Sequence, residues 1–288
     1  MIESKSLNRP TINNQSCAVC GKQDLMHHFE GLIKCNNCGF IWADVSLSSE
    51  DLKNIYGKNY FFGDEYIDYL SEEAILKIGF RKIKNQLLRL FPANKKMPDL
   101  LEIGSAYGFF LDVAKQDFNV AGVEISSDAV EYSRKKGYEI FHGELSEFDL
   151  HEKYDIAVSF ATLEHLVSPD EIVKQAFSCL KPNGFFYITT IDIGSLFARF
   201  RGNKWRMIHP PTHVSYFSSS TLQSLMKRNG FKVVECKPIW QYRSLDVLLL
   251  PKFANSLFYR LVNFLGLTRV PIPFNFGDII GLLVQKPI

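Results

Sequence analysis

The sequence of 288 residues has little net charge and no long hydrophobic run. Its 33 lysine and arginine residues nearly balance its 31 acidic residues, so the formal charge is +2. A charge this small is not typical of proteins that bind nucleic acids or anionic membranes. No apolar run reaches about 18 residues, so we expect no membrane-spanning helix. The first residues also lack the apolar stretch of a signal peptide, which predicts a cytoplasmic location.

Cysteine is scarce, but four of the six cysteines form two closely spaced pairs. In a reducing compartment such pairs bind metal more often than they form disulfides. Four thiolates hold Zn²⁺ tetrahedrally and leave no position for water, so such a site is structural. An iron–sulfur site and unliganded thiols are the alternatives. We predict a zinc ribbon over residues 1–45, with Cys17, Cys20, Cys35 and Cys38 as ligands.

After the cysteine pairs, apolar residues recur at helical spacing. The pattern runs from Ile75 to Leu90, begins behind Ser71, and ends at Pro92. Serine favours a helix start, and proline cannot continue a helix. We predict that residues 46–98 form a helical linker or lid.

From Asp99 onward, short apolar strands alternate with helical patterns. This alternation is typical of a mostly parallel sheet that is covered by helices on both faces. The predicted fold class is therefore α/β, with a doubly wound sheet in one domain over residues 99–288. The predicted strands are 99–104, 119–125, 139–142, 154–160, 185–191, 231–236 and 278–285, the predicted helices are 109–116, 127–136 and 171–180, and 181–184 is a predicted turn.

Residues 240–276 form an unusually apolar segment that is broken by Pro251. We interpret it as a helical insertion that covers the sheet or forms a homodimer face. The alternative is a peripheral contact of residues 245–265 with a membrane or a lipid-linked substrate. The segment has few lysine and arginine residues, which favours the first interpretation.

The first strand of the sheet runs into a glycine-rich turn, Gly104-Ser-Ala-Tyr-Gly108. Small residues at positions 104, 106 and 108 let the backbone approach a ligand closely. Glu124 ends the next strand, where a carboxylate can bind both hydroxyl groups of a ribose. The glycines alone are also compatible with an ordinary tight turn. Together with Glu124, they predict a site for a nucleotide-like cofactor.

The glycine turn belongs to the first of five motifs that follow one another along the chain. They are Leu101-Glu-Ile-Gly-Ser-Ala-Tyr-Gly108, Val123-Glu-Ile-Ser126, Tyr154-Asp-Ile-Ala-Val-Ser-Phe160, Leu163-Glu-His-Leu166 and Leu180-Lys-Pro-Asn-Gly-Phe185. This series resembles the class I S-adenosylmethionine-dependent methyltransferases, with the match covering residues 99–192 well. The resemblance implies a Rossmann-like sheet of seven strands, whose last strand is antiparallel and inserted between its neighbours. Residues 278–285 would be that strand.

The resemblance also implies roles for single residues. Glu102 would orient the turn and approach the methionine amine, Glu124 would bind the ribose, and Ile125 would pack on the adenine. The other implied cofactor residues are Tyr60, Gly104, Ala106, Gly108, Glu144, Leu145, Phe160 and Ala161.

Two histidines are candidates for removing a proton from the methyl acceptor. His165 follows the fourth strand, where a structural or cofactor-adjacent role is the first interpretation. His213 lies in a polar and aromatic loop after the fifth strand. Open α/β sheets bind ligands at this edge, and imidazole titrates near neutral pH. The ribbon, the methyltransferase motifs and the loop around His213 together resemble sugar methyltransferases of bacterial nucleotide-sugar and polysaccharide pathways. In that group a glutamate usually precedes the loop histidine, whereas here the residue is Thr212.

We therefore predict an enzyme that transfers a methyl group from S-adenosylmethionine to a carbon or oxygen atom of a small polar acceptor, such as a nucleotide-linked sugar. An RNA methyltransferase or nucleic-acid binder that uses the ribbon is one alternative, although the near-neutral charge argues against it. A non-catalytic scaffold with the same fold is the other.

Overall fold

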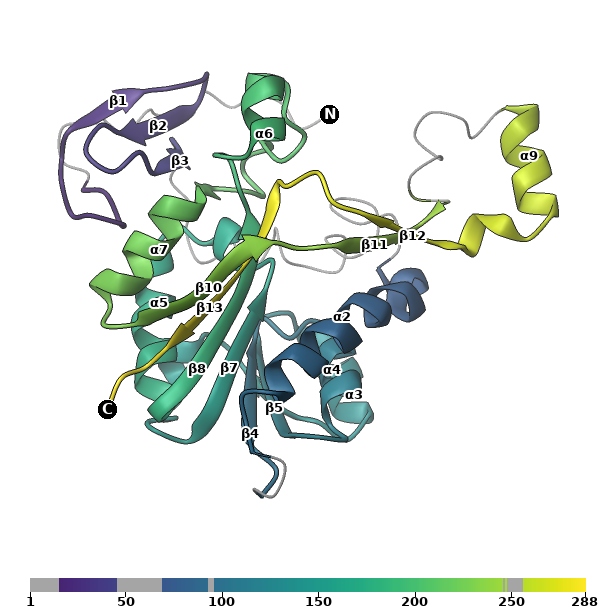
Figure 1. The fold of residues 1–288 in the computed structure, drawn as a ribbon, viewed down its shortest axis with the longest axis horizontal. Coiled ribbons are helices and arrows are strands. Elements are labelled where there is room, and N and C mark those ends of the chain that lie inside the picture. Colours follow the sequence, from purple (N-terminus) through teal and green to yellow (C-terminus); the bar gives the residue numbers. More distant parts are fainter. Residues whose placement is uncertain (1–15, 46–68, 93–95, 246, 248–255) are drawn as a thin grey trace.

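The computed structural model describes residues 16–45, 69–92, 96–245, 247 and 256–288, and the predicted cofactor residue Tyr60 lies outside them. Its centre is a seven-stranded sheet with the order β10-β13-β8-β7-β4-β5-β6 (Figure 1). The strands are β4 (Asp99–Ile103), β5 (Asn119–Glu124), β6 (Glu139–His142), β7 (Tyr154–Phe160), β8 (Leu180–Ile191), β10 (Lys232–Pro238) and β13 (Ile279–Gln285).

Only β13 runs against its neighbours in this sheet. It pairs antiparallel with β8 on one side and β10 on the other, whereas the pairs β4–β5, β4–β7, β5–β6 and β7–β8 are all parallel. The predicted mostly parallel sheet, with an inserted antiparallel last strand, is thereby confirmed.

Helices cover both faces of the sheet, because each has one apolar side to bury. In Figure 1, α2 (Glu73–Leu88), α3 (Phe109–Ala114) and α4 (Ser127–Lys135) lie on one face, and α5 (Pro169–Cys179) and α7 (Ser219–Arg228) lie on the other. Leu87, Phe110 and Val130 belong to the core under the first group. Val173 and Leu222 belong to the core under the second.

The predicted turn at 181–184 lies inside β8 rather than before it. Leu180 pairs with Tyr154 and Phe185 pairs with Ile156, so residues 181–184 bulge opposite a single residue, Asp155. Asn183 has a φ of 63°, a left-handed value that asparagine tolerates. The turn chemistry was therefore read correctly, but β8 begins earlier than the sequence indicated.

The cysteine-containing segment forms a small antiparallel sheet with a strand from far along the chain. Its strands are β1 (Leu25–His27), β2 (Leu32–Cys35), β3 (Ile41–Ala43) and β9 (Ser215–Tyr216), in that order. Ile41 pairs with Tyr216, and Trp42 pairs with Ser215. Because β9 begins two residues after His213, this sheet positions the loop that carries the histidine.

Among the residues of the apolar segment 240–276 that the structure describes, only some are helical. Two strands, β11 (Gln241–Ser244) and β12 (Pro271–Phe274), pair antiparallel and lead out to α9 (Leu257–Phe264) and the short helix η7 (Leu267–Arg269), at the right of Figure 1. Phe264 is 86% exposed. Membrane contact and dimerisation through this segment stay predictions. In the part of the chain that the structure describes, no helix has the length and apolarity needed to cross a membrane.

Candidate active site

The glycine-rich turn joins β4 to α3 with three residues at positive φ. Gly104, Ala106 and Gly108 have φ values of 75°, 44° and 70°. This left-handed region suits glycine and strains alanine. The N–H groups of Gly104 and Ser105 both donate to the carbonyl oxygen of Val123, at 2.9 and 3.1 Å. The turn is therefore tied to the end of β5, the strand that carries Glu124.

Glu124 faces this turn. Its Oε2 accepts a hydrogen bond from the N–H of Ala106 at 2.7 Å. Its Oε1 accepts from the N–H groups of Ile125 and Ser126, at 2.9 and 2.8 Å. Burial raises the pKa of the carboxyl group, and the three backbone donors oppose that rise. A carboxylate fixed beside a turn of small residues is suited to bind hydroxyl groups of a ligand.

A second buried carboxyl group, Glu102, lies in β4 two residues before Gly104. Its Oε2 and the Oγ of Ser105 have no hydrogen-bond partner within the described residues. Burial, followed by the negative charges of Glu124 and Asp112, raises the pKa of Glu102 well above its usual value. Buried polar atoms almost always have partners. Glu102 is therefore a candidate for contact with a ligand, whereas the Oγ of Ser105 lies against Gly122 of β5.

Gly104→Ala tests how tightly the turn is packed. A Cβ at position 104 would lie 2.6 Å from Oγ1 of Thr162, and φ is already 75°. At Gly137, φ is 86° but nothing lies within 4 Å of the added atom. Gly137→Ala therefore carries only the backbone strain, about 1–2 kcal/mol. We expect Gly104→Ala to reduce the free energy of unfolding by more than this in a denaturant titration. Equal losses in both variants would show that Thr162 does not press on the turn.

The predicted adenine contacts lie close to Glu124 in the chain and in space. Ile125 leaves 39% of its surface exposed, although it is a large apolar residue. The N–H of Gly143 donates to the carbonyl oxygen of Glu124 at 3.0 Å, which brings the following residues to the end of β5. Among them, Glu144 is exposed and Leu145 is buried at the start of η4 (Leu145–Glu147). Their contact with adenine stays a prediction.

Phe160 and Ala161 end β7, but their side chains face different surroundings. The ring of Phe160 packs against Phe80 of α2 and Phe110 of α3, with centroid separations of 5.0 and 4.6 Å. Its side chain is therefore part of the hydrophobic core, where burial of the aromatic surface stabilises the fold. Ala161 is exposed and has a φ of 48°. The cofactor contact of Ala161 stays a prediction, whereas the side chain of Phe160 is taken up by the core.

A cluster of three buried polar side chains includes two residues that follow shortly after β7. Thr162, which contacts the turn, is followed by the short helix η5 (Leu163–His165). Glu164, His165 and the distant His213 each place one ligand atom within 4.8 Å of the others. They are 2%, 6% and 4% exposed. We refer to them below as the Glu–His–His cluster.

Hydrogen bonds hold the two histidines in defined positions. Nδ1 of His165 lies 2.9 Å from the carbonyl oxygen of Thr212, and Nδ1 of His213 lies 2.9 Å from that of Met207. Since a carbonyl oxygen only accepts, each Nδ1 is the protonated nitrogen. The ring of His213 also stacks near His209, with 3.9 Å between centroids. The loop around His213 is thus fastened to η5.

Burial keeps both imidazoles neutral. It lowers the pKa of His165 to about 4, an effect that hydrogen bonds to the backbone of Thr212 and Ala161 oppose and the neighbouring His209 reinforces. It lowers the pKa of His213 to about 2, and the neighbouring His165 and His209 lower it further. The structure therefore brings together the two histidines that the sequence singled out, both uncharged.

Glu164 was not singled out as a site residue from the sequence. Its Oε2 accepts a hydrogen bond from Thr190 Oγ1 of β8 at 2.7 Å, and its carbonyl oxygen accepts from the N–H of Val214 at 2.8 Å. A glutamate between two apolar residues after a strand was visible in the sequence. Its burial was not, because it depends on the loop of residues 205–217 folding over η5.

The four paired cysteines converge as the spacing predicted. Sγ of Cys17 lies 3.5 Å from that of Cys38, and Sγ of Cys20 lies 3.5 Å from that of Cys35. Four thiolates bound to one Zn²⁺ at about 2.3 Å lie about 3.8 Å apart. The donor set and its spacing therefore fit a tetrahedral ion with small outward shifts.

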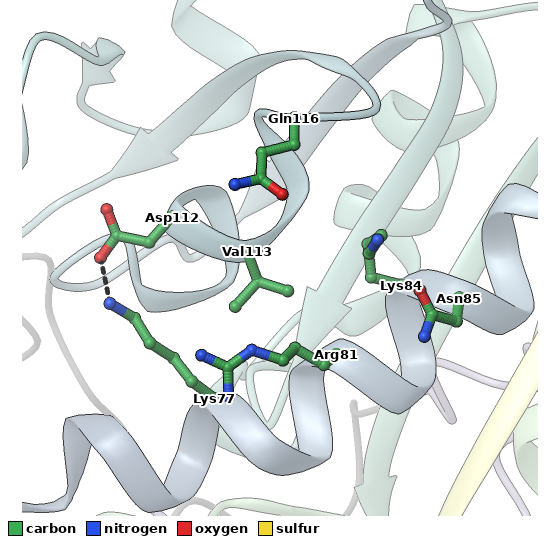
Figure 2. Close-up of a pocket in the computed structure, with 7 residues that line it drawn as sticks. All are labelled: Lys77, Arg81, Lys84, Asn85, Asp112, Val113 and Gln116. Carbon is green, nitrogen blue, oxygen red and sulfur yellow. Dashed lines mark ion pairs between the residues drawn. The ribbon is translucent and has the colours of Figure 1, made fainter.

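A polar hollow lies apart from these groups, between α2 and α3. Figure 2 shows Lys77, Arg81 and Lys84 on α2 facing residues of α3 and the chain just after it. Lys77 forms an ion pair with Asp112 at 2.7 Å. None of the predicted site residues lines this hollow, so it forms no part of the candidate site.

Comparison with known proteins agrees with the architecture. Residues 75–236 match the family described as "Methyltransferase domain". The chain belongs to this methyltransferase family. The match begins in α2 and ends in β10, and so contains the glycine turn, Glu124 and the Glu–His–His cluster.

Curated relatives cover the methyltransferase domain only in part. A malonyl-[acyl-carrier protein] O-methyltransferase of Calditerrivibrio nitroreducens is 27% identical over 112 residues, which are 38% of this chain and 46% of the relative. A ubiquinone biosynthesis O-methyltransferase of Rickettsia conorii is 24% identical over 130 residues, 43% of this chain and 42% of the relative. The chain thus spans less than half the length of these two relatives.

Solved structures show the same fold over most of the chain. A S-adenosylmethionine-dependent methyltransferase from Thermotoga maritima has a TM-score of 0.53 and 21% identity, covering 79% of this chain and 97% of its own. One from Archaeoglobus fulgidus has a TM-score of 0.51 and 20% identity, covering 76% and 99%. At this identity the likeness establishes the fold and leaves the acceptor open.

Proposed function

We propose that this protein transfers a methyl group from S-adenosylmethionine to a hydroxyl oxygen of a small polar acceptor, a nucleotide-linked sugar. One observation carries the proposal: Thr162, which lies against Gly104 of the glycine turn, directly precedes η5, the helix that carries Glu164 and His165 of the Glu–His–His cluster. The family supplies the cofactor class, and the cluster supplies polar groups for an acceptor. Both named relatives above are O-methyltransferases, which favours oxygen over carbon.

The residues around the turn suit S-adenosylmethionine in polarity and charge. The Glu124 carboxylate would bind the ribose hydroxyls, and the exposed apolar surface of Ile125 would pack on the adenine. Glu102, whose Oε2 lacks a partner within the described residues, would accept from the cationic amine. When bound, the cofactor supplies an activated methyl group, so the chain itself has to align the acceptor and manage its proton.

The acceptor hydroxyl would bind at the Glu–His–His cluster. His213 Nδ1 is held by the Met207 carbonyl, which leaves the Nε2 atom of this neutral ring for the acceptor. The carboxyl oxygens of Glu164 can accept a hydrogen bond from a bound hydroxyl group. A sugar suits such a site, since its neighbouring hydroxyl groups offer several donors to the same cluster.

We also propose that the four cysteines bind Zn²⁺ and that this ion is structural. All four Sγ atoms would be ligands, so no position would remain for a substrate. The role of the module would be to hold β9, and through it the loop of His213.

Replacing Glu124 tests the cofactor part of the proposal. Calorimetry with S-adenosylmethionine and S-adenosylhomocysteine should show binding to the wild-type protein. Glu124→Ala should reduce the free energy of binding by about 1.5–3 kcal/mol, the contribution of a hydrogen bond to a charged group. The dissociation constant should then rise about 10- to 150-fold. Glu131→Ala removes a carboxylate from the exposed face of α4 and serves as the matched control.

The outcomes separate clearly. Folded, zinc-loaded wild-type protein that binds neither compound would refute the proposed function. Equal affinities in Glu124→Ala and Glu131→Ala would remove Glu124 from the cofactor site. Acceptor screening by mass spectrometry, with a panel of nucleotide sugars, would then identify a product that has gained one methyl group.

A further inference from the structure

We propose that Glu164, His165 and His213 form a binding site for a first-row divalent metal ion, distinct from the four-cysteine site, and that this ion binds the acceptor hydroxyl. The inference rests on the proposed function for the role of the ion. The ion site itself rests on the geometry of the cluster alone.

The three side chains form a ligand set that such ions favour. Two imidazoles and one carboxylate on one side of an ion leave further positions open for other ligands. Their ligand atoms lie within 4.8 Å of one another. Ligands bound to one ion at about 2.1 Å lie about 3.0–3.5 Å apart, so binding requires shifts of only about 1–2 Å.

The hydrogen bonds of the rings match those of metal-bound histidines. Such histidines donate the ring nitrogen that does not bind the ion to a backbone carbonyl or a carboxylate. Here His165 donates from Nδ1 to Thr212, and His213 donates from Nδ1 to Met207. This leaves Nε2 of both rings to bind the ion, so the acceptor would contact the ion in place of the His213 ring. An ion would replace the contact that the ring of His165 makes with the backbone of Ala161.

The carboxylate is held in the same manner. Thr190 Oγ1 donates to Oε2 of Glu164 at 2.7 Å, which orients the group from the neighbouring strand β8. All three side chains are nearly inaccessible to solvent. Burying a carboxylate is costly unless a positive charge or hydrogen bonds compensate it. A divalent cation would supply that charge.

The position of the site gives the ion a role in the reaction. Thr162 separates the glycine turn from η5, so the ion would lie between the cofactor and the loop of His213. A hydroxyl group bound to it would lose its proton more readily, because the ion stabilises the alkoxide. The O–H bond breaks, and its proton passes to water that enters the site with the acceptor. The oxygen then forms its bond to the methyl carbon as the carbon–sulfur bond breaks, and the neutral thioether leaves.

Metal binding can be measured without turnover. Zinc-loaded protein, with excess metal removed, is titrated with Mn²⁺, and the free ion is followed by electron paramagnetic resonance. Thiolates prefer Zn²⁺ to Mn²⁺, so the four-cysteine site should not compete. Co²⁺, followed by its visible absorption, is the second probe. We expect one additional ion per chain.

Variants of the cluster decide where that ion binds. His213→Ala and His165→Ala should weaken binding at least about 100-fold. Glu164→Gln keeps the volume of the side chain and an acceptor for Thr190, so it tests the charge with the least risk to folding. His151→Ala removes an exposed histidine that bonds Ser178, and should bind the ion like the wild type.

Each result has one meaning. If S-adenosylmethionine binds but neither Mn²⁺ nor Co²⁺ does, the inference is wrong and the proposed function stands. If the ion binds at the cluster but the cofactor does not bind, the proposed function is wrong and the ion site stands. Ion binding that Glu164→Gln and His213→Ala leave unchanged would also overturn the inference.

Discussion

Replacing His213 with alanine should reduce the rate of methyl transfer by about 10²–10⁴-fold, while the affinity for S-adenosylmethionine stays close to that of the wild type. The imidazole is 4% exposed and lies in the Glu–His–His cluster rather than in the glycine turn. Its loss removes a group that would contact the acceptor, directly or through a bound ion. Nothing in the contacts of Glu124 or Ala106 depends on it.

The measurement is a single-turnover rate with labelled cofactor and the acceptor found by screening, alongside calorimetry of cofactor binding. Because His213 is buried, the alanine variant can also lose stability. His213→Asn keeps a donor for the Met207 carbonyl and should lose the rate as well. His27→Ala, which removes an exposed histidine of β1, should leave both rate and affinity unchanged. A wild-type rate in His213→Asn would show that the histidine takes no part in the reaction.

The strands and the glycine turn could be predicted because their signals are local. An apolar run such as 154–160, bounded by turn residues, is typical of a buried strand in a chain whose strands and helices alternate. The bounds of β6 and β7 agree with the prediction at both ends. The same holds for the proximity of the four cysteines, since two short pairs joined by a hairpin have little freedom.

The cluster itself could be predicted only in part. His165 and His213 were selected from their places after strands, but Glu164 was passed over because nothing local indicates that it is buried. Its burial depends on hydrogen bonds from Val214 and Thr190, which lie 50 and 26 positions away in the sequence. The sequence around a single residue does not show its contacts with residues so far away in the chain.

Phe160 and the segment 240–276 also differ from the prediction because of contacts with residues distant in the sequence. The end of β7 was expected to serve the cofactor, but the ring of Phe160 packs into an aromatic core made by two helices. The apolar run 240–276 was expected to be helical throughout, whereas its ends pair as β11 and β12. Strand pairing joins segments separated by more than twenty residues, so the apolar pattern alone did not reveal it.

If the four cysteines bind Zn²⁺ as proposed, loss of that ion should slow methyl transfer at the separate active site. Structural zinc supplies about 10–16 kcal/mol of folding free energy in small domains, so its removal should unfold the module outright. The module then no longer pairs β3 with β9 or packs Phe40 against Phe217, whose ring centroids are 5.0 Å apart. The hydrogen bond from Ala43 N to the Val214 carbonyl, at 2.8 Å, is lost as well. Val214, the residue next to His213, thereby loses this contact with the module.

Cys35→Ser should therefore lower the methyl-transfer rate about 100-fold, since a shift of about 1 Å in a reacting group has that effect. Cofactor binding should fall far less, because the N–H groups of Gly104, Ser105 and Ala106 donate to Val123 and Glu124, which lie outside the module. Cys236→Ser, at a half-buried cysteine outside the module, is the control and should keep both metal content and rate. Hydrogen exchange should show faster exchange at β9 in Cys35→Ser alone. If β9 stays protected and the rate is unchanged, the module does not position His213, and its sheet has some other purpose.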